Sequence, residues 1–236
     1  MCTSTAPGVA SRPGDPSSQG DRVDGKVVIA WAFEGCDSPR SPSPSLDGDM
    51  DFLDEAAGSA PTAPERSQDH TARRAAADRF AVALAADPVL AQSVWTTATR
   101  DPRLAHVDGD ALWVLCAAAG ATSASDSAAL ARAEAIVAGR AMTARDSELA
   151  WAGAQLAIQG AQSALQAAVA ETLDLHLAAW GRERRVEVLD FLHSRGDGRC
   201  VRPVEALLAR QGHLLDDVQA YKARHLVQVI RRGRRK

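Results

Sequence analysis

The side chains of this chain that could bind a metal ion or act as nucleophiles are six histidines and four cysteines. Helical metal sites place two ligands about four residues apart, and zinc ribbons use closely spaced cysteine pairs. Neither spacing occurs here. His193, Cys200 and His213 would meet only if the fold brought them together. Cys116 lies in an apolar run and is predicted to be a buried free thiol. We therefore expect no metal site and no cofactor.

Catalytic motifs are also missing from the sequence. It holds no glycine-rich phosphate loop, no nucleophile elbow and no carboxylate pair in an apolar setting. Asp47, Asp49 and Asp51 match the first ligands of a calcium loop, but Phe52 takes the place of the turn glycine and Gly58 that of the bidentate glutamate. These substitutions exclude calcium. We expect a protein that is not an enzyme, and an enzyme of unrecognised type stays open as an alternative.

Basic side chains are concentrated at the end of the sequence. Residues 181–236 hold 14 Lys/Arg against 7 Asp/Glu, a net charge of +7. The whole chain has a net charge of −3, so residues 1–180 have a net charge of −10. The candidate contacts to phosphate or another polyanion are Lys222, Arg224, Arg231, Arg232, Arg234, Arg235 and Lys236. Two short helices around Gly212 would outline a helix-turn-helix. Asp216 and Asp217 would repel phosphate at the start of the second helix, so a terminal helix with a solvated basic tail is the other interpretation.

Composition favours an alanine-rich helical protein in the cytoplasm. Apolar residues make up 46% of the chain and aromatic residues only 4%, so the core must depend on close helix contacts through small side chains. The chain has 24 arginines but only three lysines, a bias typical of a GC-rich, bacterial genome. We find neither a signal peptide nor an apolar run long enough to span a membrane. We expect no membrane association.

The front of the chain, residues 1–67, is predicted to be a disordered acidic arm and linker. It is rich in Ser, Pro, Gly and Asp, and prolines alternate with other residues over 38–45. One apolar run interrupts it: Val27, Val28, Ile29 and Trp31 fall within 26–33, between two glycines. Such a run predicts a short isolated strand. The strand would pack on the helical body or pair with the sheet of another protein.

Helices are predicted from residue 69 onward. Asp87 and Pro88 should end a helix over 69–86 and start the next one, which runs to about Thr99. Asp110 is the predicted cap of a buried helix over 111–119 that ends at Gly120, and a helix over 128–138 should end at Gly139. Thr143 and Asp146 match a capping box in front of a long helical stretch over 146–180, for which Gly160 is the natural break.

Three further helices are predicted in the last quarter of the chain. They cover 182–193, 203–211 and 214–231, with a turn at 195–198 and a stop at Gly212. Val186 to Leu192 would also suit a strand, because this run is rich in β-branched residues.

One stretch resembles a known family. Leu149, Trp151, Leu156 and Gly160, followed by the Ala/Leu helix after Ala164, resemble a tetratricopeptide-type helix hairpin. Residues 111–120 and 128–137 repeat the pattern about 40 residues earlier, against a family period of about 34. The closing proline of the family is absent. The order of these helices over residues 75–175 is also similar to the helical half of an uncharacterised actinobacterial domain family. The resemblance implies helix-hairpin packing and no known activity.

Together these patterns predict an all-α fold: a helix-hairpin array with a disordered N-terminal arm and one short isolated strand. The expected domains are the arm (1–67), a helical hairpin domain (68–180) and a C-terminal helical subdomain with a basic tail (181–236). We expect a non-enzymatic protein-interaction or scaffold protein with a protein partner. The alternative is a nucleic-acid-binding accessory protein that uses the basic C-terminus.

Overall fold

The structure is a computed structural model that describes residues 23–34, 63–122, 128–160 and 162–233. Every regular element in these ranges is helical, which confirms the all-α class. The α-helices are α1 (Gly25–Ala32), α2 (Ala63–Ala86), α3 (Pro88–Ala98), α4 (Gly109–Ala121), α5 (Ala128–Met142), α6 (Ser147–Gln159), α7 (Gln166–His176), α8 (Arg182–Arg195), α9 (Val201–Gln211) and α10 (Asp217–Gly233). Short 3-10 turns are η2 (Pro102–His106), η3 (Ser163–Leu165) and η4 (Gly212–Leu214).

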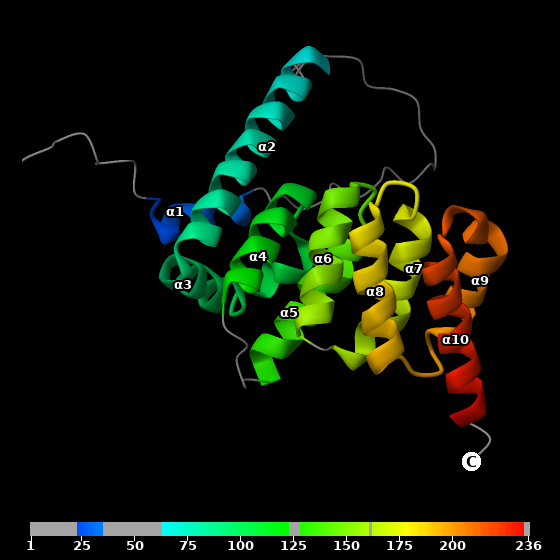
Figure 1. Cartoon of the computed structure of the whole chain (residues 1–236). Helices are drawn as coiled ribbons and strands as arrows, with labels where there is room; N and C mark the ends of the chain where they lie inside the picture. Colours follow the sequence, from blue (N-terminus) through cyan, green and yellow to red (C-terminus); the bar gives the residue numbers. More distant parts are fainter. Residues whose placement is uncertain (1–22, 35–62, 123–127, 161, 234–236) are drawn as a thin grey trace, which may run out of the picture.

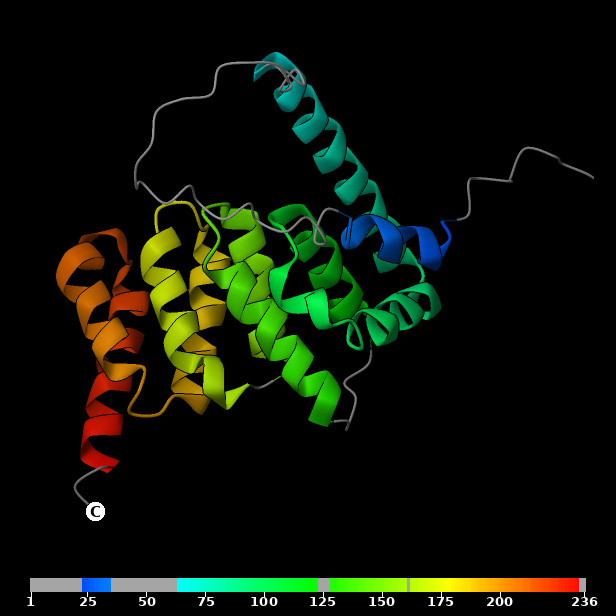
Figure 2. The same cartoon turned by 180° about the vertical axis from the view of Figure 1, so that it is seen from behind.

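The helices form a two-layer array of hairpins (Figure 1). Helices α2, α4, α6, α8 and α10 pack side by side in one layer, which we call the even layer. Helices α3, α5, α7 and α9 form the odd layer behind it, seen from the other side in Figure 2. Each odd helix contacts the even helix that follows it in the sequence, from α3 with α4 to α9 with α10. The array predicted from the helical periodicity is therefore observed.

Capping aspartates explain where helices α1, α3, α4 and α6 begin. Asp87 accepts hydrogen bonds from the backbone N–H groups of Val89 and Leu90 at 3.0 Å, and Pro88 follows as the first helical residue, as predicted. Gly160 ends α6, which confirms the predicted break. Two predicted caps are displaced: Asp108, not Asp110, caps α4, and Asp146 itself caps α6. Aspartate oxygens thus satisfy N–H groups that have no partner inside the helix.

The predicted strand at 26–33 is wrong, because residues 25–32 form helix α1. Asp24 caps it by accepting a hydrogen bond from the Lys26 N–H at 2.9 Å. Val28 and Ala32, one turn apart, are fully buried, and Phe33 beside them is 2% exposed. Helix α1 packs on α3 and α4. Burial of this face outweighs the β-preference of the valine run, so residues 23–34 belong to the helical body and not to a flexible arm.

Other differences concern glycines and the last quarter of the chain. Gly120 and Gly139 do not stop their helices, which continue to Ala121 and Met142. Residues 182–195 are helical, so the strand alternative for 186–192 is wrong. Helix α2 begins at Ala63, so residues 63–67 of the predicted arm are helical. The other parts of that arm, residues 1–22 and 35–62, lie outside the described ranges, and so do the rejected calcium-like segment and the proline-rich linker. Over the described residues, no helix is both long and apolar enough to cross a membrane.

The core follows the junction of the two layers. Helix α4 is central, as predicted: Ala111, Val114, Leu115 and Ala118 are completely buried. Farther along the array, Trp180 is 1% exposed and meets Trp151 edge to face at 5.3 Å. The indole N–H of Trp180 donates a hydrogen bond to the carbonyl of Ser147. This bond holds the segment that follows α7 against the start of α6. These contacts hold the even layer in place and so position its outer face.

Candidate interaction face

Helices α4 and α6 of the even layer carry a repeated acid–tryptophan pair, of which Asp110 and Trp151 are each only 8% exposed. Asp110 and Trp113 lie one turn apart near the start of α4, and Glu148 and Trp151 lie one turn apart near the start of α6. The two tryptophans are 38 positions apart in the sequence. A neighbouring even helix supplies an arginine to each pair: the helix before α4 supplies Arg74, and the helix after α6 supplies Arg184.

In the first pair, Arg74 of α2 lies over the ring of Trp113 at 5.2 Å. Its guanidinium Nη1 is 3.7 Å from a carboxylate oxygen of Asp110 and 3.7 Å from one of Asp146, the cap of α6. A cation over an aromatic ring and between two carboxylates is attracted by all three groups. Arg74 therefore ties α2, α4 and α6 together.

In the second pair, Arg184 of α8 lies over the ring of Trp151 at 5.2 Å. Its two terminal nitrogens donate to the two carboxylate oxygens of Glu148 at 2.7 and 2.8 Å. This bidentate hydrogen bond from Arg184 lowers the pKa of the Glu148 carboxyl. The fork geometry sets the distance and orientation between α6 and α8.

A first groove runs between α4 and α6. It has a volume of about 400 Å³ and a mostly small, apolar lining that includes Ala117, Gly120, Ala121, Ala152 and Leu156. Cys116 also lines it, but burial raises the pKa of this thiol to about 12. A thiol with that pKa stays protonated at neutral pH and is not a nucleophile. The groove is therefore suited to holding side chains and not to attacking a substrate.

A second, larger groove runs along α8 beside the end of α6, with a volume of about 800 Å³. Ile158 and Val186, both half-buried, supply apolar surface. Exposed carboxylates stand around them: Glu183, Glu187 and Asp190. Arg182 and Arg195 also line this groove, and Arg182 is hydrogen-bonded to Asp216 at 2.9 Å. An apolar patch among carboxylates favours an apolar side chain with a cation close by.

Gln159 lines both grooves, which places them next to each other on one face. Its side chain is exposed, and it is the last residue of α6. We call the two grooves and Gln159 the even-layer trough. The lining of the trough changes from small and apolar side chains between α4 and α6 to charged side chains along α8, three carboxylates and two arginines. A long, flexible ligand could contact both parts at once.

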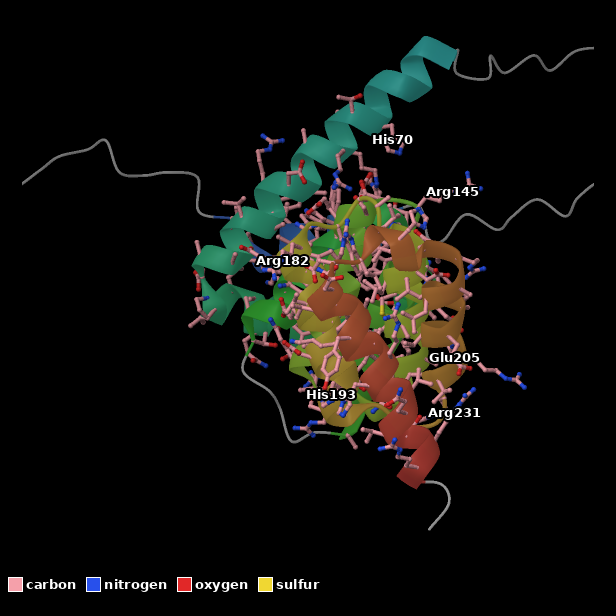
Figure 3. All side chains as sticks on the ribbon, turned by 45° about the vertical axis from the view of Figure 1, so that its right-hand side comes forward. His70, Arg145, Arg182, His193, Glu205 and Arg231 are labelled. Carbon is pink, nitrogen blue, oxygen red and sulfur yellow. The ribbon has the colours of Figure 1, made fainter. Side chains whose placement is uncertain are left out.

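The structure separates the predicted polyanion contacts. Lys222 donates to Asp190 of α8, and Arg231 forms an ion pair with Glu205 of α9; Figure 3 shows Arg231 and Glu205 at this end of the array. Arg224 and Arg232 are exposed. Arg234, Arg235 and Lys236 lie outside the described residues. Of the basic side chains within α10, Lys222 and Arg231 thus contact the two neighbouring helices.

His193 and Cys200, two of the three residues that a zinc site would require to meet, each bond to a different group. His193 hydrogen-bonds to His225 of α10, with 2.9 Å between Nε2 and Nδ1. The Cys200 thiol donates to the carbonyl of Asp197 at 2.9 Å. In the part of the chain that the structure describes, no group of three or more His, Cys, Asp or Glu side chains could hold a metal ion.

The trough is not among the sites predicted from the sequence. The acid–tryptophan repeat at Asp110/Trp113 and Glu148/Trp151 is visible in the sequence and would have marked α4 and α6 as equivalent helices. The α8 groove has no such signal, because its lining depends on which helices become neighbours. The chain matches no family model, no curated protein and no solved structure.

Proposed function

We propose that this chain is a non-enzymatic interaction module whose even-layer trough binds a segment of a partner protein. The observation that supports this proposal most directly is that two grooves meet at Gln159 on a face built from stacked helices. Stacked hairpins of the tetratricopeptide type, which the sequence resembles, form extended surfaces of this kind. The function follows from a surface and not from a catalytic residue.

The lining of the trough defines the partner. Small apolar side chains between α4 and α6 leave room for an apolar side chain of the ligand. Glu183 and Glu187 on α8 favour a ligand with Lys or Arg close to that anchor, whereas Asp190 is already paired with Lys222. The expected ligand is therefore a peptide segment with an apolar anchor at one end and basic residues at the other.

The proposal is tested by selecting peptides from a random display library on the full chain and measuring affinity by fluorescence anisotropy. The groove variant is Glu187→Arg, which reverses a charge on α8. The matched control is Glu171→Arg, which makes the same change at an exposed residue of α7 in the odd layer. We expect the selected peptides to carry basic residues and to lose about tenfold or more in affinity with Glu187→Arg, and to be unaffected by Glu171→Arg.

Two results would contradict the proposal. One is a set of selected peptides that binds both variants equally well, because the trough would then not be the binding site. The other is tight binding of DNA or RNA that is lost steeply as salt is added and that requires Arg224 and Arg232. That outcome would support the accessory nucleic-acid-binding protein that the basic C-terminus also predicts.

A further inference from the structure

The last helix carries an exposed apolar strip that the proposed function does not use. Exposed fractions are 50% for Val218, 66% for Tyr221 and 48% for Val229, and Leu214 just before the helix is 39% exposed. Other exposed large apolar residues in the described ranges occur singly, on α1, α2, α3, α5 and α7. Single exposed apolar residues are normal, but a row of them along one helix indicates a contact surface.

This strip faces away from the rest of the array. The opposite face of α10, with Ala223, Leu226 and Val227, is buried against α8 and α9. Lys222 reaches to α8 and Arg231 to α9, so both flanks of the helix are occupied. Figure 3 looks toward this end of the molecule, with α10 in front. The apolar strip is therefore open to a partner.

The spacing of the strip matches that of a helix–helix seam. Val218, Tyr221, His225 and Val229 follow one another at intervals of three, four and four residues, which keeps them on one side of a helix. Two contacts hold the ring of His225: the hydrogen bond to His193 and the ring of Tyr221 at 5.7 Å. We call these four residues the α10 seam. The rings of Tyr221 and His225 at its centre are therefore held before any partner arrives.

The α10 seam is complementary to itself when reversed. Val218 and Val229 lie at its two ends, with Tyr221 and His225 between them, so the order of side-chain types is nearly the same in both directions. The exposed side chain of Asp217 lies beside one end and the exposed side chain of Arg232 beside the other. An antiparallel copy would place Val218 against Val229 and Asp217 near Arg232, at both ends.

We propose that the α10 seam binds the α10 seam of a second copy of this chain, antiparallel and around a two-fold axis. A two-fold contact requires a surface that is complementary to itself, and this seam meets that requirement in shape and in charge. From Val218 to Arg232 the helix is about 21 Å long, at about 1.5 Å per residue. One helix of this length buries little area, so the dimer has a dissociation constant in the micromolar range.

Sedimentation equilibrium of the full chain over a range of concentrations tests the proposal. We expect the average mass to rise from that of one copy toward two, and Tyr221→Glu to weaken dimerisation about tenfold or more. Val82→Glu is the matched control, because it places the same charge at an apolar residue of α2 that is 70% exposed and outside the seam. Tyr221 is exposed, so its variant retains the fold, and circular dichroism checks this.

The antiparallel order is tested by reversing charges. Arg232→Glu should weaken the dimer, because each end of the seam then places two carboxylates together, and adding Asp217→Arg to it should restore most of the affinity. A chain that stays monomeric overturns the proposal and leaves the seam to a different protein. A dimer that Tyr221→Glu does not weaken also overturns it, and a double variant that is weaker than Arg232→Glu overturns the antiparallel arrangement.

Discussion

At the scale of single residues, Gly153 shows how an alanine-rich core is packed. A Cβ atom at this position would stand 2.7 Å from the Ala141 Cβ, 2.8 Å from the Ala138 carbonyl oxygen and 2.9 Å from the Met142 nitrogen. Two of these atoms belong to the backbone of α5 and cannot rotate away. The glycine is therefore needed for the approach of α5 and α6 and not for an unusual backbone angle.

We predict that Gly153→Ala destabilises the protein by about 1–3 kcal/mol, because the methyl group forces two helices apart. Gly139→Ala is the matched control inside α5, where the nearest atom to the new methyl group is the Leu165 Cδ2 at 3.9 Å. There, alanine should stabilise by about 0.5–1 kcal/mol through its helix propensity. Urea unfolding measures both. Equal effects of the two substitutions would show that α5 and α6 do not pack this closely.

The Glu148–Arg184 pair gives a prediction about pH. Arg184 lowers the pKa of Glu148 in the folded state, so the pair contributes stability above the carboxyl's usual pKa of 4.5 and loses it as the pH falls through the folded value. Both side chains are partly exposed, at 53% and 31%, so the contribution is about 0.5–1 kcal/mol. Glu148→Gln should cost this much near pH 7.

Urea unfolding of Glu148→Gln at about pH 7 and about pH 3 tests the sign of this effect. The difference from the unchanged chain should shrink at the acidic pH, because protonation of the carboxyl removes the charge that Arg184 pairs with. Glu171→Gln serves as the control on an exposed surface. A difference that is equally large at the acidic pH would mean that the substitution acts through packing and not through charge.

At the scale of elements, helix α1 is the largest change from the sequence prediction. Val28, Ala32 and Phe33 are buried, and Trp31 meets Phe80 of α2 edge to face at 5.3 Å. Arg103 from η2 lies over the ring of Phe33 at 5.1 Å. A segment with these contacts closes the first end of the array.

We predict that Phe33→Ala destabilises the protein by about 3 kcal/mol, because it leaves a cavity under a side chain that is buried against the body. Val27→Ala, at a position of α1 that is 56% exposed, should change stability by less than about 0.5 kcal/mol. Thermal and urea unfolding measure both variants. If residues 23–34 were a detached arm, the two substitutions would be equally harmless.

Local signals in the sequence predict where most helices begin, but not which faces they bury. Asp87 with Pro88, and Gly160, act within one turn of the chain, so their effect is visible in the sequence. Whether residues 26–33 form a strand or a helix depends on the surface offered by α3 and α4, which lie more than fifty residues later. Gly120 and Gly139 remain helical because packing outweighs a cost of about 1 kcal/mol each.

At the scale of the whole molecule, the candidate sites also depend on packing between distant helices and not on local sequence signals. Net charge marks the basic C-terminus as a candidate site, but Lys222 and Arg231 form ion pairs with residues of α8 and α9. The trough and the α10 seam arise from the order in which helices stack, and no local motif marks that order. A single sequence therefore predicts the array better than it predicts the surfaces of the array.

The array also makes a prediction about how the molecule opens. Helices α4, α5 and α6 pack against neighbours on both sides along the array, whereas α1 and α10 lie at its ends. In stacked hairpins stability is approximately a sum over neighbouring units, so the ends open more easily than the middle. Amide hydrogen exchange should be slowest in α4 to α6 and fastest in α1 and α10, measured in the Tyr221→Glu variant so that dimerisation does not protect α10.

Two cavity variants test this coupling. Leu115 in α4 and Leu226 in α10 are both buried leucines, at 0% and 2% exposure, and each alanine substitution should cost about 2–5 kcal/mol locally. Leu115→Ala should speed exchange throughout the molecule, because the centre then limits the stability of both sides. Leu226→Ala should speed it mainly in α9 and α10. If Leu226→Ala accelerates exchange in α4 as much as in α10, the chain opens as one cooperative unit, and the independence of its ends is wrong.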